Sequence, residues 1–161
     1  MPQLTREHML AELTRTRAEL LDVLGRVPDD HFDRPQTFNQ WSLKDVLAHL
    51  VNWDRLTIQG LDLVLQGRAH EIPVPDTEKI NAINTRAVAR RRPVTRAQVM
   101  EDLQRTRREL LAWVERLTDA QIADESAPFP VRRWLPLVYQ HEGEDHLPKI
   151  RAWEAAIPGM R

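Results

Sequence analysis

The chain has 161 residues and a formal net charge of −1, with 42% hydrophobic and 29% charged residues, a composition typical of one globular domain. This near-neutral charge gives no general attraction to nucleic acid or to an anionic membrane, and the absence of cysteine excludes disulfides, thiolate metal sites and a cysteine nucleophile. The N-terminus lacks a signal-peptide pattern and no apolar run reaches membrane-spanning length, so we expect a cytoplasmic protein that binds neither nucleic acid nor membrane.

Helix-forming patterns follow one another along the chain, and no segment alternates with the period of a strand. Ser, Thr and Asp residues stand at N-cap positions before four apolar-periodic segments, and a group of prolines precedes the fifth. The predicted helices cover residues 5–25, 42–66, 76–91, 95–117 and 136–156. The sequence therefore predicts an all-α fold.

An internal repeat organises these helices. Residues 4–32 align without a gap on 94–122, with eleven identities at a shift of 90 residues. The repeat predicts that 5–66 and 95–156 are duplicated helical hairpins, joined by a long crossover that carries the short helix. Such a pair closes most simply as a four-helix bundle, so we expect residues 1–161 to form a single domain.

Two further expectations concern the surface. The arginine-rich stretches 15–17 and 105–108 alternate with acids, which predicts solvated helix faces. Because the helices are broadly apolar, we also expect residual apolar surface to be buried in a two-fold homodimer.

A histidine stands in an apolar helix between Trp41 and Trp53. Ser42 is a good N-cap, and most of the residues that follow are Val, Leu or Ala. The ring of His49 lies among them, and a buried imidazole needs a partner for each ring nitrogen. One interpretation is a core histidine that bonds a carbonyl or Asp45; the other is a metal ligand.

A second histidine and an acid share an apolar face of the last predicted helix. At about 100° per residue, Tyr139 and Trp153 fall on that face, with His146 in its middle and Glu142 one turn earlier. Together with His49, these two side chains form the ligand set of an open metal site. The alternative is a structural polar core in which Glu142 and His146 bond each other.

The segments FNQWSLKDVLAHLVNW and HLPKIRAW make the chain resemble the DinB/DfsB-like superfamily. These four-helix bundles are related to bacillithiol- and mycothiol-dependent S-transferases and to the N-terminal domain of maleylpyruvate isomerase. The resemblance covers essentially the whole chain. It implies a DinB-like bundle that binds a divalent metal (Zn, Ni or Fe) through one histidine on the second helix and an HxxxH pair on the last.

The resemblance assigns His49 as the first ligand and His146 as the last. His141 matches by its YQH context, but it stands five residues before His146, one more than the HxxxH spacing. A π-bulge can absorb one inserted residue, and Gly143 and Pro148 favour such a distortion. With a bulge, the ligands are His49, His141 and His146.

In a regular helix His141 faces aside, and Glu142 replaces it as the third ligand. A third outcome is that the metal has been lost. Trp53 and Trp153 are candidates for the walls of a pocket, and Asn81 and Asn84 on the crossover helix are candidates for its mouth.

The resemblance implies a metal-dependent enzyme, a thiol S-transferase or a hydrolase, that acts on a small electrophilic compound. The metal would lower the pKa of water or of a low-molecular-weight thiol, with Glu142 or Asp145 as the nearest proton acceptor. The alternatives are a non-catalytic protein that binds or sequesters a small molecule, and a structural dimer with a vestigial site.

Overall fold

The computed structural model describes residues 4–159, and every regular element within that range is helical. The α-helices are α1 (Arg6–Leu24), α2 (Leu43–Leu65), α3 (Thr77–Arg91), α4 (Arg96–Glu115), α5 (Asp119–Ala123), α6 (Val131–Gln140) and α7 (Leu147–Ala155). A π-helical turn, His141–His146, joins α6 directly to α7, and short 3-10 helices at Asp29–His31 and Ala69–Glu71 lie in connections. The predicted all-α class is confirmed. None of these helices is both long and apolar enough to cross a membrane.

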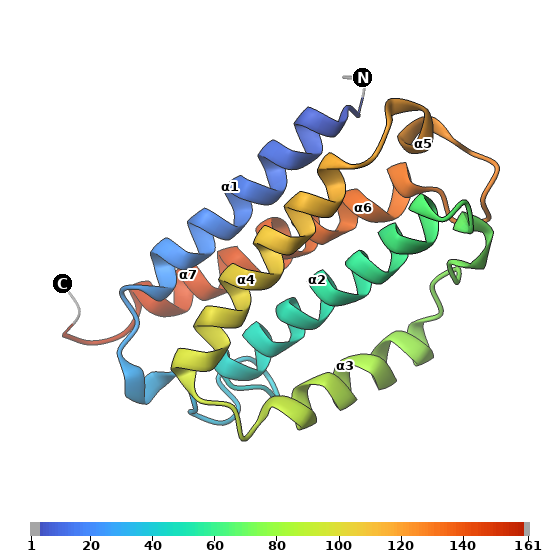
Figure 1. Ribbon diagram of the computed structural model, residues 1–161. Coiled ribbons are helices and arrows are strands. Elements are labelled where there is room, and N and C mark those ends of the chain that lie inside the picture. Colours follow the sequence, from blue (N-terminus) through green and yellow to red (C-terminus); the bar gives the residue numbers. More distant parts are fainter. Residues whose placement is uncertain (1–3, 160–161) are drawn as a thin grey trace.

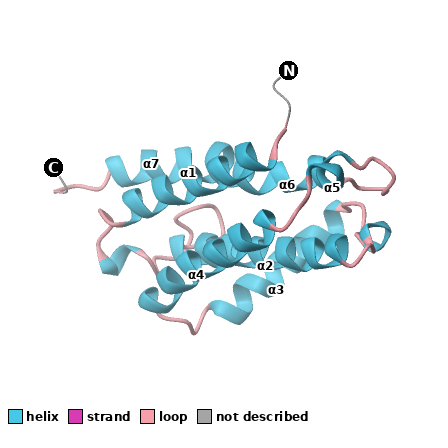
Figure 2. Ribbon diagram, turned by 45° about the horizontal axis from the view of Figure 1, so that its top comes forward, coloured by secondary structure: helices cyan, strands magenta, loops and turns pink. Residues whose placement is uncertain are grey.

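The long helices run side by side along one axis (Figure 1). α4 packs against both α1 and α2, while α1 also contacts α6 and α7. The last member of the bundle is the continuous unit of α6, the π-helical turn and α7, and Figure 2 shows it on the same side as α1, with α2 and α4 opposite. α3 lies outside this bundle and packs on α2.

Side-chain caps start the first four long helices where the sequence predicted them. The Oγ1 atoms of Thr5 and Thr95 and the side chain of Asp76 each accept a bond from the backbone three residues on. Ser42 and Asp45 form a complete capping box, with both bonds 3.1 Å long. The start of α2 is therefore fixed by its own first turn.

We expect the Ser42→Ala variant to lose about 1 kcal/mol of unfolding free energy, because the N–H of Asp45 then has no side-chain acceptor. Denaturant unfolding measures the loss. Ser126→Ala is the matched control, since Ser126 is exposed, its backbone N–H keeps the bond to Asp124, and solvent replaces what its hydroxyl contributes. Equal stability of the two variants would contradict the role assigned to the cap.

The predicted start of the last helix, at residue 136, was wrong. The helix begins at Val131, directly after Pro130, and Pro136 lies inside α6. Pro136 lacks the N–H of a regular helical bond, but Trp134 and Leu135 are buried beside it, and this packing outweighs the lost bond. The five-residue α5, which Thr118 caps, was missed because so short a helix shows no periodicity.

The interior consists of two apolar clusters with a polar layer between them. One cluster contains Met9, Leu13, Leu61, Leu110 and Leu135, and the other contains Leu20, Leu24, Leu47, Leu103 and Leu147. The side chains buried between them are polar or charged: Thr16, Arg17, Asp54, Thr57, Thr106, Arg107 and Glu142.

The prediction that residues 15–17 and 105–108 lie on solvated faces was wrong for two of the arginines. Arg17 and Arg107 are each only 3% exposed. Each guanidinium reaches both Asp54 and Glu142, so two buried positive charges meet two buried negative charges. This neutralisation makes their burial possible.

The polar layer also shows the symmetry that the repeat implies. Nη1 of Arg17 donates to the carbonyl oxygen of Leu103, and Nη1 of Arg107 donates to that of Leu13. A shift of 90 residues converts the first bond into the second. Such reciprocal contacts are what a two-fold axis between duplicated halves produces.

Candidate metal centre

The π-helical turn brings two histidines of the last helix together. In a regular α-helix, residues five apart point about 140° away from each other. In the turn His141–His146, the two Nε2 atoms instead lie 2.9 Å apart. The turn packs closely on α1, since a Cβ atom at Gly143 would lie 3.0 Å from Cγ2 of Thr16. Glycine therefore fits this contact without a shift.

Three imidazoles converge at this point. Nε2 of His49, on α2, lies 2.8 Å from Nε2 of His141. Suitable nitrogen atoms of His49, His141 and His146 all lie within 4.8 Å of one another. The cluster thus joins α2 to the π-helical turn across the interior of the bundle.

In His49 and His141, the ring nitrogen that faces away from the cluster, Nδ1, lies within hydrogen-bonding distance of an acceptor. Nδ1 of His49 lies 3.1 Å from Oδ1 of Asn84, and Nδ1 of His141 lies 2.9 Å from Oδ2 of Asp145. Because an amide oxygen and a carboxylate only accept, each Nδ1 must carry the proton. In the neutral rings, both Nε2 atoms then present lone pairs to the centre of the cluster.

Burial keeps two of the rings neutral. Desolvation, with the neighbouring imidazoles adding to it, lowers the pKa of His49 to about 3. Desolvation and His141 likewise lower the pKa of His146 to about 4. At neutral pH these rings carry no charge, which is the state in which imidazole binds a metal.

This arrangement fits a divalent cation. The lone pairs of His49 and His141, which face each other at 2.8 Å, repel unless an electropositive species lies between them. Two nitrogen ligands of a tetrahedral zinc ion lie about 3.3 Å apart, so the cluster needs to open by only roughly 0.5 Å to hold one. Three histidines are also a ligand set that leaves one position for water or substrate.

Glu142, the alternative third ligand, points elsewhere. Its Oε1 atom accepts from Nε of Arg17 at 2.8 Å, and its Oε2 accepts from Arg17 at 2.9 Å and from Arg107 at 2.6 Å. Burial alone would raise the pKa of Glu142, but the two guanidinium groups hold that pKa below its ordinary value. The carboxylate of Glu142 is thus hydrogen-bonded within the polar layer. The π-helical turn places His141, and not Glu142, beside His49.

The pocket candidates from the sequence lie at different distances from the histidines. The ring of Trp53 meets that of His49 edge-on, with centroids 6.2 Å apart. Trp153 lines a cavity of about 600 Å³ that His146 also lines. Asn81 is exposed on α3 and lines neither of the cavities described for residues 4–159, whereas Asn84, one turn later, bonds His49.

Sequence reasoning missed the charged groups that hold the π-helical turn in place. Arg17 lies inside the apolar stripe of α1, four residues after Leu13 and three before Leu20, and Arg107 occupies the same place on α4. A charge repeated at equivalent positions within two apolar stripes predicts a buried ionic layer. That pattern was available in the repeat.

The fold has a counterpart among solved structures. A crystal structure of an uncharacterised protein from Escherichia coli UTI89 superposes with a TM-score of 0.77, covering 95% of this chain and 94% of that one. The two sequences are 13% identical, so the likeness concerns the fold alone. No curated protein sequence matches the chain. The sequence model of one family matches residues 12–147, most of the chain, and the protein therefore belongs to the DinB superfamily.

Proposed function

We propose that this protein is a divalent-metal-dependent enzyme that acts on a small electrophilic compound, as a thiol transferase or a hydrolase. The observation that supports this function is the meeting of three imidazole Nε2 atoms beside a cavity. His146 belongs to both features. A substrate in the cavity would therefore lie next to the proposed ligands His49, His141 and His146.

When bound, a divalent cation supplies Lewis acidity, which lowers the pKa of a water molecule or thiol beside it and stabilises negative charge on the substrate. The protein supplies the rest of the site. Asn84 and Asp145 orient two of the rings through their Nδ1 atoms. The surrounding apolar helices hold the ligands in place and limit access of water to His49, which is 3% exposed.

Two carboxylates, Glu142 and Asp145, lie next to the proposed ligands, and Asp145 is the better proton acceptor. Glu142 is paired with two arginines inside the polar layer. Asp145 lies at the surface, with 62% of its side chain exposed, and contacts His141. A proton leaving the substrate would therefore pass to Asp145 or to solvent.

We expect one equivalent of a divalent metal in protein purified without a nickel column, as measured by elemental analysis. The metal-loaded protein should then consume either L-cysteine with 1-chloro-2,4-dinitrobenzene or p-nitrophenyl acetate faster than buffer containing the same metal. Metal uptake with no turnover of a broad panel of such compounds would favour the sequestering protein. Absence of metal after incubation with Zn²⁺, Ni²⁺ and Fe²⁺ would leave the structural bundle as the explanation.

A further inference from the structure

The cavity beside His146 has the size and lining of a site for a small organic molecule. Its volume of about 600 Å³ lies within the range typical of ligand pockets. Aromatic and aliphatic side chains form most of the wall, and three uncharged polar residues, one histidine and one lysine complete it. The lining consists of Thr37, Phe38, Asn39, Gln40, Trp41, Val46, His146, Lys149, Ile150, Ala152 and Trp153.

A tight backbone turn fixes two of the aromatic walls. The N–H of Phe38 donates to the carbonyl of Trp41 at 2.8 Å, and the N–H of Trp41 donates back to the carbonyl of Phe38 at 3.1 Å. Asn39, between them, has a φ of 57°, in the left-handed region that asparagine tolerates better than most residues. Trp153 packs on Phe38 with ring centroids 5.4 Å apart. The walls are thus ordered by their own contacts.

Only one side chain in this lining carries a permanent charge, and it is positive. Lys149 stands on α7, three residues after His146. Asp145, one helical turn before it, binds His141 instead. Among the ion pairs of residues 4–159, none involves Lys149, so its ammonium group is available to an anion in the cavity.

We propose that this cavity receives a small organic acid with a flat apolar body. The body packs on Phe38, Trp41 and Trp153, and the carboxylate pairs with Lys149. Aromatic side chains favour flat partners, and the ammonium group favours a negative charge over a neutral amide of the same shape. This inference rests on the proposed function in placing the reacting part of that acid beside the three histidines.

The test compares 3-phenylpropionate with 3-phenylpropionamide, which differ in charge but hardly in shape. Binding is followed by tryptophan fluorescence on chelator-treated, metal-free protein, so that no metal can attract the carboxylate. We expect the acid to bind about three- to tenfold more tightly than the amide at low salt, and this ratio to shrink at 0.5 M salt. Lys149→Gln should remove the difference while leaving the affinity for the amide unchanged, and Lys149→Arg should preserve it.

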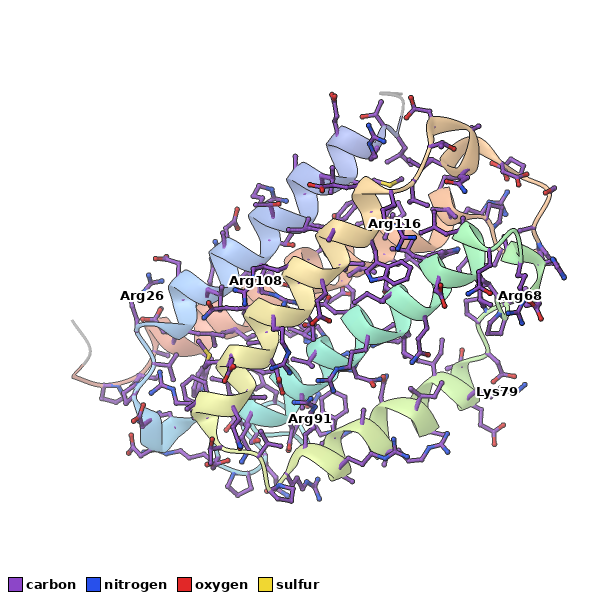
Figure 3. The ribbon with its side chains drawn as sticks, viewed as in Figure 1. Arg26, Arg68, Lys79, Arg91, Arg108 and Arg116 are labelled. Carbon is purple, nitrogen blue, oxygen red and sulfur yellow. The ribbon has the colours of Figure 1, made fainter. Side chains whose placement is uncertain are left out.

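Lys79→Gln is the matched control. Lys79 is exposed and lies at the outer edge of α3, pointing away from the bundle (Figure 3). This variant should bind both compounds as the unmodified protein does. Equal affinity for acid and amide, an unchanged ratio in Lys149→Gln, or no saturable binding of either compound would overturn the inference.

The outcome is independent of the metal. A protein that takes up no metal but still prefers the acid through Lys149 would refute the proposed function and leave this inference standing. A metal-loaded, active protein whose cavity shows no preference for the acid would refute this inference and leave the proposed function standing.

Discussion

Glu142→Ala is expected to cost about 3–5 kcal/mol of unfolding free energy. The change removes the acceptor of three buried bonds and leaves Arg17 and Arg107 to share Asp54 alone. A buried, uncompensated positive charge results. For a domain of this size the melting temperature should fall by about 6–20 °C, which calorimetry measures.

Glu19→Ala is a matched control for this experiment. Glu19 also accepts from two arginines, Arg15 at 2.8 Å and Arg151 at 2.9 Å, but at the surface. Its loss should cost less than about 1 kcal/mol, because solvent replaces both bonds. Glu142→Gln keeps the volume and removes the charge, so it should retain most of the destabilisation of Glu142→Ala. If Glu142→Ala and Glu19→Ala unfold at the same denaturant concentration, the ionic layer does not have the role assigned to it.

His49→Ala is expected to abolish stoichiometric metal uptake. Only two imidazoles of the cluster would remain, both on the π-helical turn, and a cation would lose its contact with α2. Substitution of outer-shell partners typically reduces metal affinity by about 10- to 100-fold, so loss of a ligand should reduce it by more than about 100-fold. Elemental analysis and competition with a chromophoric chelator measure both quantities.

Variants around the ligands sharpen this prediction. Asn84→Ala and Asp145→Ala should each weaken metal binding by about 10- to 100-fold without abolishing it, because they remove only the acceptor that orients a ring. His70→Ala changes an exposed histidine of the connection after α2 and should bind metal normally. Unchanged metal content in a folded His49→Ala protein would refute the site.

Local sequence patterns were sufficient to predict most of the fold. The caps at Thr5, Ser42, Asp76 and Thr95 place helix starts because their bonds lie within the first turn and need no tertiary contact. The duplicated segment indicated two related halves, but the predicted pairing of helices into hairpins was wrong. Within residues 4–159, α1 packs closely on α4, α6 and α7 rather than on α2, the other helix of its predicted hairpin. The start of α6 escaped prediction because it depends on burial of Trp134 and Leu135, which only the assembled core supplies.

The candidate site shows the same limit. Periodicity placed His49 and His146 in the interior, but it could not decide between His141 and Glu142 as their neighbour. That choice depends on Arg17 and Arg107, which lie far away in sequence and draw the carboxylate of Glu142 into the polar layer. A helix considered alone contains no information about such partners.

The reciprocal bonds of Arg17 to Leu103 and of Arg107 to Leu13 indicate how a duplicated protein can evolve from a single half. Residues 5–66 alone contain one arginine and one acid of the polar layer, Arg17 and Asp54. Two copies of that segment, related by a two-fold axis, would contribute two of each, and the four charges would again sum to zero. A gene for half of this protein could thus already encode a neutral, self-complementary dimer. Fusion of two such genes would then free each half to diverge.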